Sequence, residues 1–152
     1  MTTENTKTNP EAQIRALLNE WANALRSKDS AAVMSHYAAD LVQFDLAPPL
    51  KYAGANALDK KALEKWFSSF QASIGYEIRD LSITAGDNVA FCHSLNRLTG
   101  RKTGGEEVDV WLRATVCFRR IEGKWTITHL HDSVPFYMDG SYKAAVDLKP
   151  DA

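Results

Sequence analysis

The side-chain periodicity of this chain changes once, after Phe70, and does not change back. Before that point apolar residues recur every three or four positions, the spacing of one helix face, and after it they alternate as in strands. A chain whose helices come before its long strands predicts an α+β domain, with helices covering one face of an antiparallel sheet. Its 152 residues are enough to bury such a core without disulfides or metals.

Capping residues predict where three helices begin, and turn residues separate the strands. The predicted helices run from Asn9 to about Ser27, from Asp29 to about Tyr37, and from Asp59 through an apolar stripe that ends at Phe70; the predicted strands cover 41–46, 74–84, 89–102, 107–120 and 124–134. The element order is therefore α-α-β-α-β-β-β-β. We expect a disordered segment over residues 1–8, a domain over 9–136 and a C-terminal tail over 137–152.

Composition excludes several partners. The net charge of −1 favours neither nucleic acid nor an anionic membrane. The first residues contain no apolar stretch, so no signal peptide or membrane anchor is expected. Two cysteines are too few for a disulfide scaffold, which makes a cytoplasmic location the default. Nothing in the sequence predicts a cofactor.

Two glycine turns predict how the last three strands pair. Gly104-Gly105 suits a two-residue hairpin loop, and Ile121-Glu122-Gly123 suits a three-residue loop closed by a glycine bulge. These registers divide the side chains into two faces. The more apolar face should pack under the helices and line a pocket, and it carries Phe91, His93, Leu95, Arg97, Val110, Leu112, Ala114, Val116, Phe118, Thr128, Leu130, Asp132 and Val134.

The predicted inner face includes charged positions. Arg97, Leu112 and Asp132 fall in one row across three strands, and a bare charge on an apolar face is costly. Arg97 and Asp132 therefore form either a structural ion pair or part of a ligand site. His93 is either a satisfied core histidine or an acid–base group. Asp45 is either a turn residue that accepts backbone N–H groups or a catalytic base.

The opposite face is half polar and includes Trp111, Arg113, His129 and His131. Aromatic side chains, arginine and paired histidines on one sheet face are typical of a homodimer interface, although a solvated outer face is the alternative. His129-x-His131 could contact a metal, but no third ligand is evident, so no metal site is predicted. Cys92 and Cys117 come out opposite each other on this face and are expected to be reduced thiols.

Two segments carry a resemblance to a known family. They are Tyr37-Ala38-Ala39-Asp40 with Phe44-Asp45, and the last strand from Gly123 to Ser133. With the element order, they resemble the SnoaL-like and ketosteroid-isomerase-like branch of the nuclear-transport-factor-2-like superfamily over roughly residues 10–136. The resemblance implies a cone-shaped roll, with three helices on the concave face of a curved, mainly antiparallel sheet.

The same resemblance implies roles for individual residues. Asp45 matches the general-base aspartate of the steroid isomerases, whereas Trp21 and Val116 stand where those enzymes have their two oxyanion donors. Both donors are missing, which argues against steroid isomerisation itself. The chain also resembles the association domain of calcium/calmodulin-dependent protein kinase, where the positions of His93, Val116 and Asp132 hold pocket arginines.

Two functions remain open at this level. In the first, the protein is an isomerase- or lyase-type enzyme on a small, largely apolar carbonyl compound, with Asp45 as base, His93 or Asp132 as second acid–base group and Arg97 as charge stabiliser. In the second, it is a non-catalytic dimeric ligand-binding or assembly module. The residues expected to bind the ligand are Trp21, Tyr37, Trp66, Phe70, Tyr76, Arg97, Leu112, Val116 and Leu130.

Overall fold

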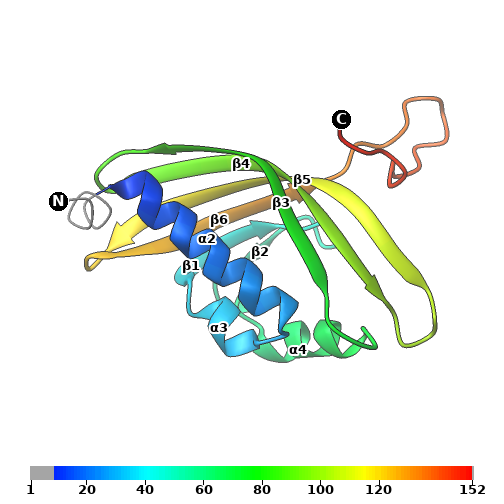
Figure 1. Cartoon of the computed structure of the whole chain (residues 1–152), viewed down its shortest axis with the longest axis horizontal. Coiled ribbons are helices and arrows are strands. Elements are labelled where there is room, and N and C mark those ends of the chain that lie inside the picture. The colour runs from blue at the N-terminus through cyan, green and yellow to red at the C-terminus, as the bar shows by residue number, and fades with distance from the viewer. Residues whose placement is uncertain (1–8, 152) are drawn as a thin grey trace.

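The computed structural model describes residues 9–151, so the disorder expected for residues 1–8 lies outside the described chain. These residues form three α-helices, one short 3₁₀-helix and six strands, in the predicted order apart from the added strand β2 and the 3₁₀-helix (Figure 1). The elements are α2 (Pro10–Arg26), α3 (Ser30–Met34), β1 (Tyr37–Phe44), β2 (Tyr52–Ala53), η1 (Gly54–Asn56), α4 (Lys60–Ser68), β3 (Gly75–Ala85), β4 (Val89–Arg101), β5 (Glu107–Ile121) and β6 (Lys124–Ser133).

The three predicted helix starts are confirmed by their capping bonds. The side chains of Asn9, Asp29 and Asp59 each accept a backbone N–H three residues further on, at 3.3, 3.1 and 3.0 Å. The second helix is shorter than expected, because β1 already begins at Tyr37. None of the helices between residues 9 and 151 is long and apolar enough to cross a membrane.

The strands form one curved, open sheet in the order β2-β1-β6-β5-β4-β3. Neighbouring strands are antiparallel except β1 and β6, which are parallel. The helices all lie on one side of this sheet, and α2 runs along it (Figure 1). The predicted α+β architecture is confirmed. Its most deeply buried side chains join α2 and α3 to the sheet, and they are Ile14, Val33, Leu41, Cys92, Phe118 and Ile127.

The hairpin between β4 and β5 differs from the prediction by one residue. Lys102 N–H donates to Glu106 O at 2.8 Å, which leaves a three-residue loop, Thr103-Gly104-Gly105. Gly105 has φ 92°, the left-handed conformation that closes such a loop. Arg97 therefore lies opposite Trp111, and not opposite Leu112 as the two-residue loop predicted.

The hairpin between β5 and β6 also differs. Its loop has two residues, Glu122 and Gly123, with φ 51° and 78°, as a type I′ turn requires. A bulge between Cys117 and Phe118 then shifts the register further along the strands. As a result, Asp132 lies opposite Ala114.

These registers determine which side chains face the helices. Along β5 the predicted inner residues Leu112, Ala114, Val116 and Phe118 are buried. Along β4 the prediction was wrong. The loop between β4 and β5 has one residue more than predicted, and a register shift of one residue turns every side chain of a strand to the other face. The inward residues of β4 are Ala90, Cys92, Ser94 and Asn96, whereas His93 is exposed and Phe91 is 47% exposed. Trp125 and Ile127 of β6, predicted to face outward, are also buried.

Candidate active site

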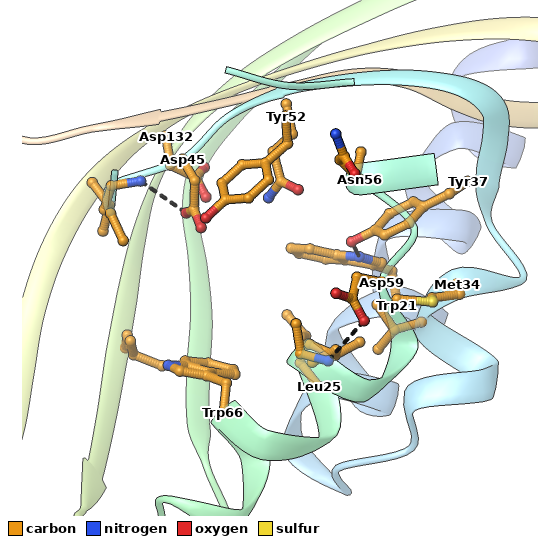
Figure 2. Close-up of a pocket in the computed structure, with 18 of the residues that line it drawn as sticks. Trp21, Leu25, Met34, Tyr37, Asp45, Tyr52, Asn56, Asp59, Trp66 and Asp132 are labelled. Carbon is orange, nitrogen blue, oxygen red and sulfur yellow. Dashed lines mark hydrogen bonds between the residues drawn. The ribbon is translucent and has the colours of Figure 1, made fainter. Parts of the chain in front are cut away.

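A cavity of about 410 Å³ lies between the helices and the end of the sheet (Figure 2). Its walls come from the three α-helices, the loop after β1, η1 and all six strands. Most of the lining is apolar or aromatic, as is usual for a small-molecule site. The lining residues are Trp21, Leu25, Val33, Met34, Tyr37, Gln43, Asp45, Leu46, Ala47, Tyr52, Asn56, Ala57, Asp59, Ala62, Leu63, Trp66, Tyr76, Leu98, Leu112 and Asp132.

The structure brings together most of the site residues predicted from the sequence. Trp21, Tyr37, Asp45, Trp66, Tyr76, Leu112 and Asp132 all line this cavity. Three others, Phe70, Val116 and Leu130, are core residues that are at most 5% exposed and do not line it. Phe70 packs on Trp66 and lies 4.1 Å from Lys102 Nζ.

The expected positions of His93 and Arg97 in the cavity are wrong, because the register of β4 reverses their face. His93 is exposed and lies opposite Thr115. Arg97 donates from Nε and Nη2 to the two carboxylate oxygens of Asp109, at 2.9 and 2.8 Å. The structural ion pair considered for Arg97 therefore exists, but its partner is Asp109 and not Asp132.

Asp132 is a cavity carboxyl with strongly altered acidity. It extends from the end of β6 into the apolar space and is only partly exposed. Loss of hydration raises the pKa of its carboxyl to about 7, and the negative charge of Asp45 contributes in the same direction. A carboxyl with this pKa can both release and take up a proton near neutral pH.

Asp45 directly follows β1 and stands at the mouth of the cavity beside Asp132 (Figure 2). Its Oδ1 accepts the Leu46 N–H at 2.8 Å, which is the turn role considered from the sequence. No residue between 9 and 151 donates to its Oδ2. Asp45 also lines an adjoining outer groove with Lys51 and His131, so solvent can reach its carboxylate.

Two phenols face the same cavity. Tyr37 Oη accepts a hydrogen bond from Trp21 Nε1 at 3.0 Å, and Tyr76 Oη accepts one from Asn96 Nδ2 at 2.8 Å. Burial raises the pKa of both phenols well above the usual value, and the carboxylate charges of Asp132 and Asp45 raise it further. Both are therefore neutral over the whole range in which Asp132 titrates.

Sequence reasoning missed Asn96. It was assigned to the outer face, yet it is 3% exposed and bonds to a cavity tyrosine. The only feature of the sequence that could have placed Asn96 correctly was the length of the β4–β5 loop, since counting Thr103 into that loop turns Asn96 inward.

Among the described lining residues there is no lysine, arginine or histidine, so the cavity offers no cation to an anionic ligand.

Comparison with known proteins agrees with this architecture. The family model of the SnoaL-like domain matches residues 14–137. A nuclear-transport-factor-2-like protein of unknown function from Pseudomonas putida is 33% identical, with 92% of this chain and 96% of that chain covered and a TM-score of 0.81. A ketosteroid isomerase-like protein from Erwinia carotovora is 21% identical, with 80% and 93% covered and a TM-score of 0.67. No curated protein matches the sequence. The chain belongs to the family of SnoaL-like domains.

Proposed function

We propose that this protein is an acid–base enzyme of the isomerase or lyase type, acting on a small, largely apolar carbonyl compound. One observation carries the proposal: Asp45 and Asp132 line a single apolar cavity in which no described lining residue is a cation. Two carboxyl groups in different surroundings, one solvent-accessible and one desolvated, can hold different protonation states at the same pH. The isomerase-like description of the Erwinia carotovora neighbour supports the same reaction class.

The proposed reaction begins with the ionised carboxylate of Asp45. It takes a proton from the carbon next to the carbonyl, the C–H electron pair becomes the new C=C bond, and the carbonyl oxygen takes the negative charge. Asp132 in its protonated form then gives a proton. In a substrate with a neighbouring C=C bond it goes to the γ-carbon of the conjugated dienolate (isomerisation), and in a β-hydroxy substrate it goes to the hydroxyl oxygen as the bond from the β-carbon to that oxygen breaks and the carbonyl re-forms (dehydration). His93 and Arg97 have no part in this scheme, since both lie outside the cavity.

The test is exchange of α-protons into D₂O, which requires no knowledge of the natural substrate. Acetophenone and cyclohexanone are small enough for the cavity, and loss of their α-proton signals is followed by ¹H NMR. The native protein is expected to accelerate exchange above the buffer rate. Exchange at the buffer rate for both ketones would contradict the proposed chemistry.

A non-catalytic ligand-binding module is the second candidate, and one observation favours it. Asp45 is exposed and already accepts the Leu46 N–H, as a purely structural turn aspartate would. Such a module would bind the same ketones without exchanging their α-protons. The exchange experiment therefore separates the two candidates.

We also propose that the outer face of the sheet forms a homodimer interface. This face carries Phe91, Trp111, Arg113, His129 and His131. It is rich in aromatic side chains: Phe44 packs edge-on against both histidines, at 4.8 and 5.3 Å between ring centroids. Aromatic residues and arginine are enriched in protein interfaces.

Two unbonded cysteines, Cys92 and Cys117, support a cytoplasmic location for this dimer.

Arg113→Glu is expected to weaken the proposed dimer by at least about tenfold, because it places two new carboxylates in a contact between identical surfaces. Light scattering over a concentration series measures the change. Arg15→Glu is the matched control, since Arg15 lies on the exposed side of α2. A native monomer, or a dimer unaffected by Arg113→Glu, would refute this interface.

A further inference from the structure

Two hydrogen-bond chains begin in the scaffold and end at the cavity. In one, Trp21 Nε1 donates to Tyr37 Oη at 3.0 Å (Figure 2). In the other, Ser94 Oγ donates to Asn96 Oδ1 at 2.7 Å, and Asn96 Nδ2 donates to Tyr76 Oη at 2.8 Å. Both chains reach a phenol that lines the cavity, and in both the phenol is the acceptor.

The direction of these bonds determines what each phenol can still do. An indole N–H can only donate, so Tyr37 Oη must accept from Trp21 and its own proton points elsewhere. Asn96 holds Tyr76 in the same acceptor role, because its Oδ1 is already engaged by Ser94. Within residues 9–151 neither phenol donates to any acceptor. A buried O–H without an acceptor is costly, unless a ligand or water supplies one.

We propose that the hydroxyls of Tyr37 and Tyr76 together form a two-donor site for the carbonyl oxygen of the ligand. This inference rests on the proposed function and deepens it, since it names the atoms that would stabilise the negative oxygen of the enolate. Hydrogen-bond donors already aimed at the position where charge develops are an effective form of transition-state stabilisation.

Trp21 contacts both phenols. It binds Tyr37 through its N–H, and its ring packs edge-on against Tyr76 with 5.5 Å between ring centroids. Asp45 and Asp132 lie across the cavity from Tyr37 (Figure 2). A ligand whose oxygen meets the phenols would therefore direct its neighbouring C–H bonds toward the carboxylates.

This arrangement also defines the ligand class. A neutral carbonyl oxygen accepts two hydrogen bonds and carries no charge for Asp45 or Asp132 to repel. A carboxylate ligand would bring a negative charge into a cavity whose described lining contains three aspartates, Asp45, Asp59 and Asp132, and no cation. The site therefore selects ketones or aldehydes over carboxylic acids of similar size.

The probe for this site is acetophenone labelled with ¹³C at the carbonyl, observed by infrared spectroscopy while bound. In the native protein the C=O band is expected at a lower frequency than in the Tyr37→Phe/Tyr76→Phe double variant, because two donors weaken that bond. Each single variant should give an intermediate band and weaken binding roughly 2- to 10-fold, the range for one hydrogen bond.

Tyr52→Phe is the matched control. Tyr52 lines the same cavity, but its hydroxyl already donates to Pro48 O at 2.9 Å, so its loss should leave the carbonyl band in place. Asn96→Asp is an independent variant that keeps both tyrosines. A carboxylate at this position can only accept hydrogen bonds, so the Tyr76 hydroxyl would donate to it and no longer to the ligand. The carbonyl band should then move as it does in Tyr76→Phe.

The result that would overturn the proposal is acetophenone that fails to bind, or a carbonyl band that is the same in the native protein and in the double variant. The readout does not depend on turnover. A lowered band without α-proton exchange would leave the carbonyl site intact and remove the proposed enzyme function. Exchange of α-protons with an unchanged carbonyl band would leave the proposed enzyme function intact and remove the carbonyl site.

Discussion

Asp45→Asn is expected to lower the rate of α-proton exchange by about 10²- to 10⁴-fold at neutral pH, the range for loss of a general base. Asparagine has nearly the same shape and still offers an oxygen to the Leu46 N–H, so the turn after β1 should persist. What it cannot do is take a proton. The loss should appear in the rate at saturating ketone, and the affinity for acetophenone should change much less.

Asp40→Asn is the control for this prediction. It makes the same substitution in β1, the strand that Asp45 follows, but Asp40 pairs with Arg119 on the surface and does not line the cavity. Its exchange rate should equal that of the native protein. A rate for Asp45→Asn within about twofold of the native rate, with unchanged folding by circular dichroism, would remove Asp45 from the mechanism.

Asp132→Asn is expected to make the protein more stable at pH 8 than the native protein. The folded-state pKa of Asp132, about 7, lies above the usual value of 3.8. Between these values the folded state binds more protons than the unfolded state, so native stability falls as pH rises through this window. Each pH unit corresponds to about 1.4 kcal/mol, so the loss approaches about 4 kcal/mol above pH 7. Asparagine carries no charge to desolvate and should abolish most of this loss.

Urea unfolding at pH 5 and pH 8 measures this effect. The native protein should lose free energy of unfolding between the two pH values, and Asp132→Asn should lose much less. The same variant should lose proton-transfer activity, because a desolvated carboxyl is useful to catalysis and costly to folding. An equal pH dependence in the two proteins would show that Asp132 is not desolvated in the folded state.

The helices could be predicted because their signals are local. Asn9, Asp29 and Asp59 cap the helices that follow them, and each capping bond spans only three residues. The apolar stripe of α2 needs no knowledge of the sheet to be recognised. The short strand β2 was missed, since Tyr52 and Ala53 carry no alternating pattern and depend on pairing with β1.

The strand faces depended on counting loop residues, and one residue decided each outcome. Treating Thr103 as a strand residue reversed the face of β4, which placed His93 and Arg97 inside and Asn96 outside. Two errors in β6 offset each other in their effect on the face: the shorter loop and the bulge at Cys117 and Phe118 each shift the pairing by one residue in the same direction, and a shift of two residues returns each side chain to its predicted face. The inward position of Asp132 was therefore predicted correctly through two compensating mistakes.

The candidate site was predictable where either strand alternation or the family resemblance gave a signal. Asp45 was found through the resemblance, and Asp132 through the alternation of the last strand. The hydrogen-bond chain from Ser94 through Asn96 to Tyr76 was not predicted, because Ser94 and Asn96 face inward only when the loop between β4 and β5 has three residues.

The decisive experiment is a ¹³C NMR titration of the Asp132 carboxyl carbon, because the proposed function requires Asp132 to be desolvated and to interact with the charge of Asp45. We expect Asp132 to titrate near pH 7 and its pKa to fall in Asp45→Asn, because the neighbouring negative charge is removed. A midpoint near 3.8, unaffected by Asp45→Asn, would contradict the proposed function.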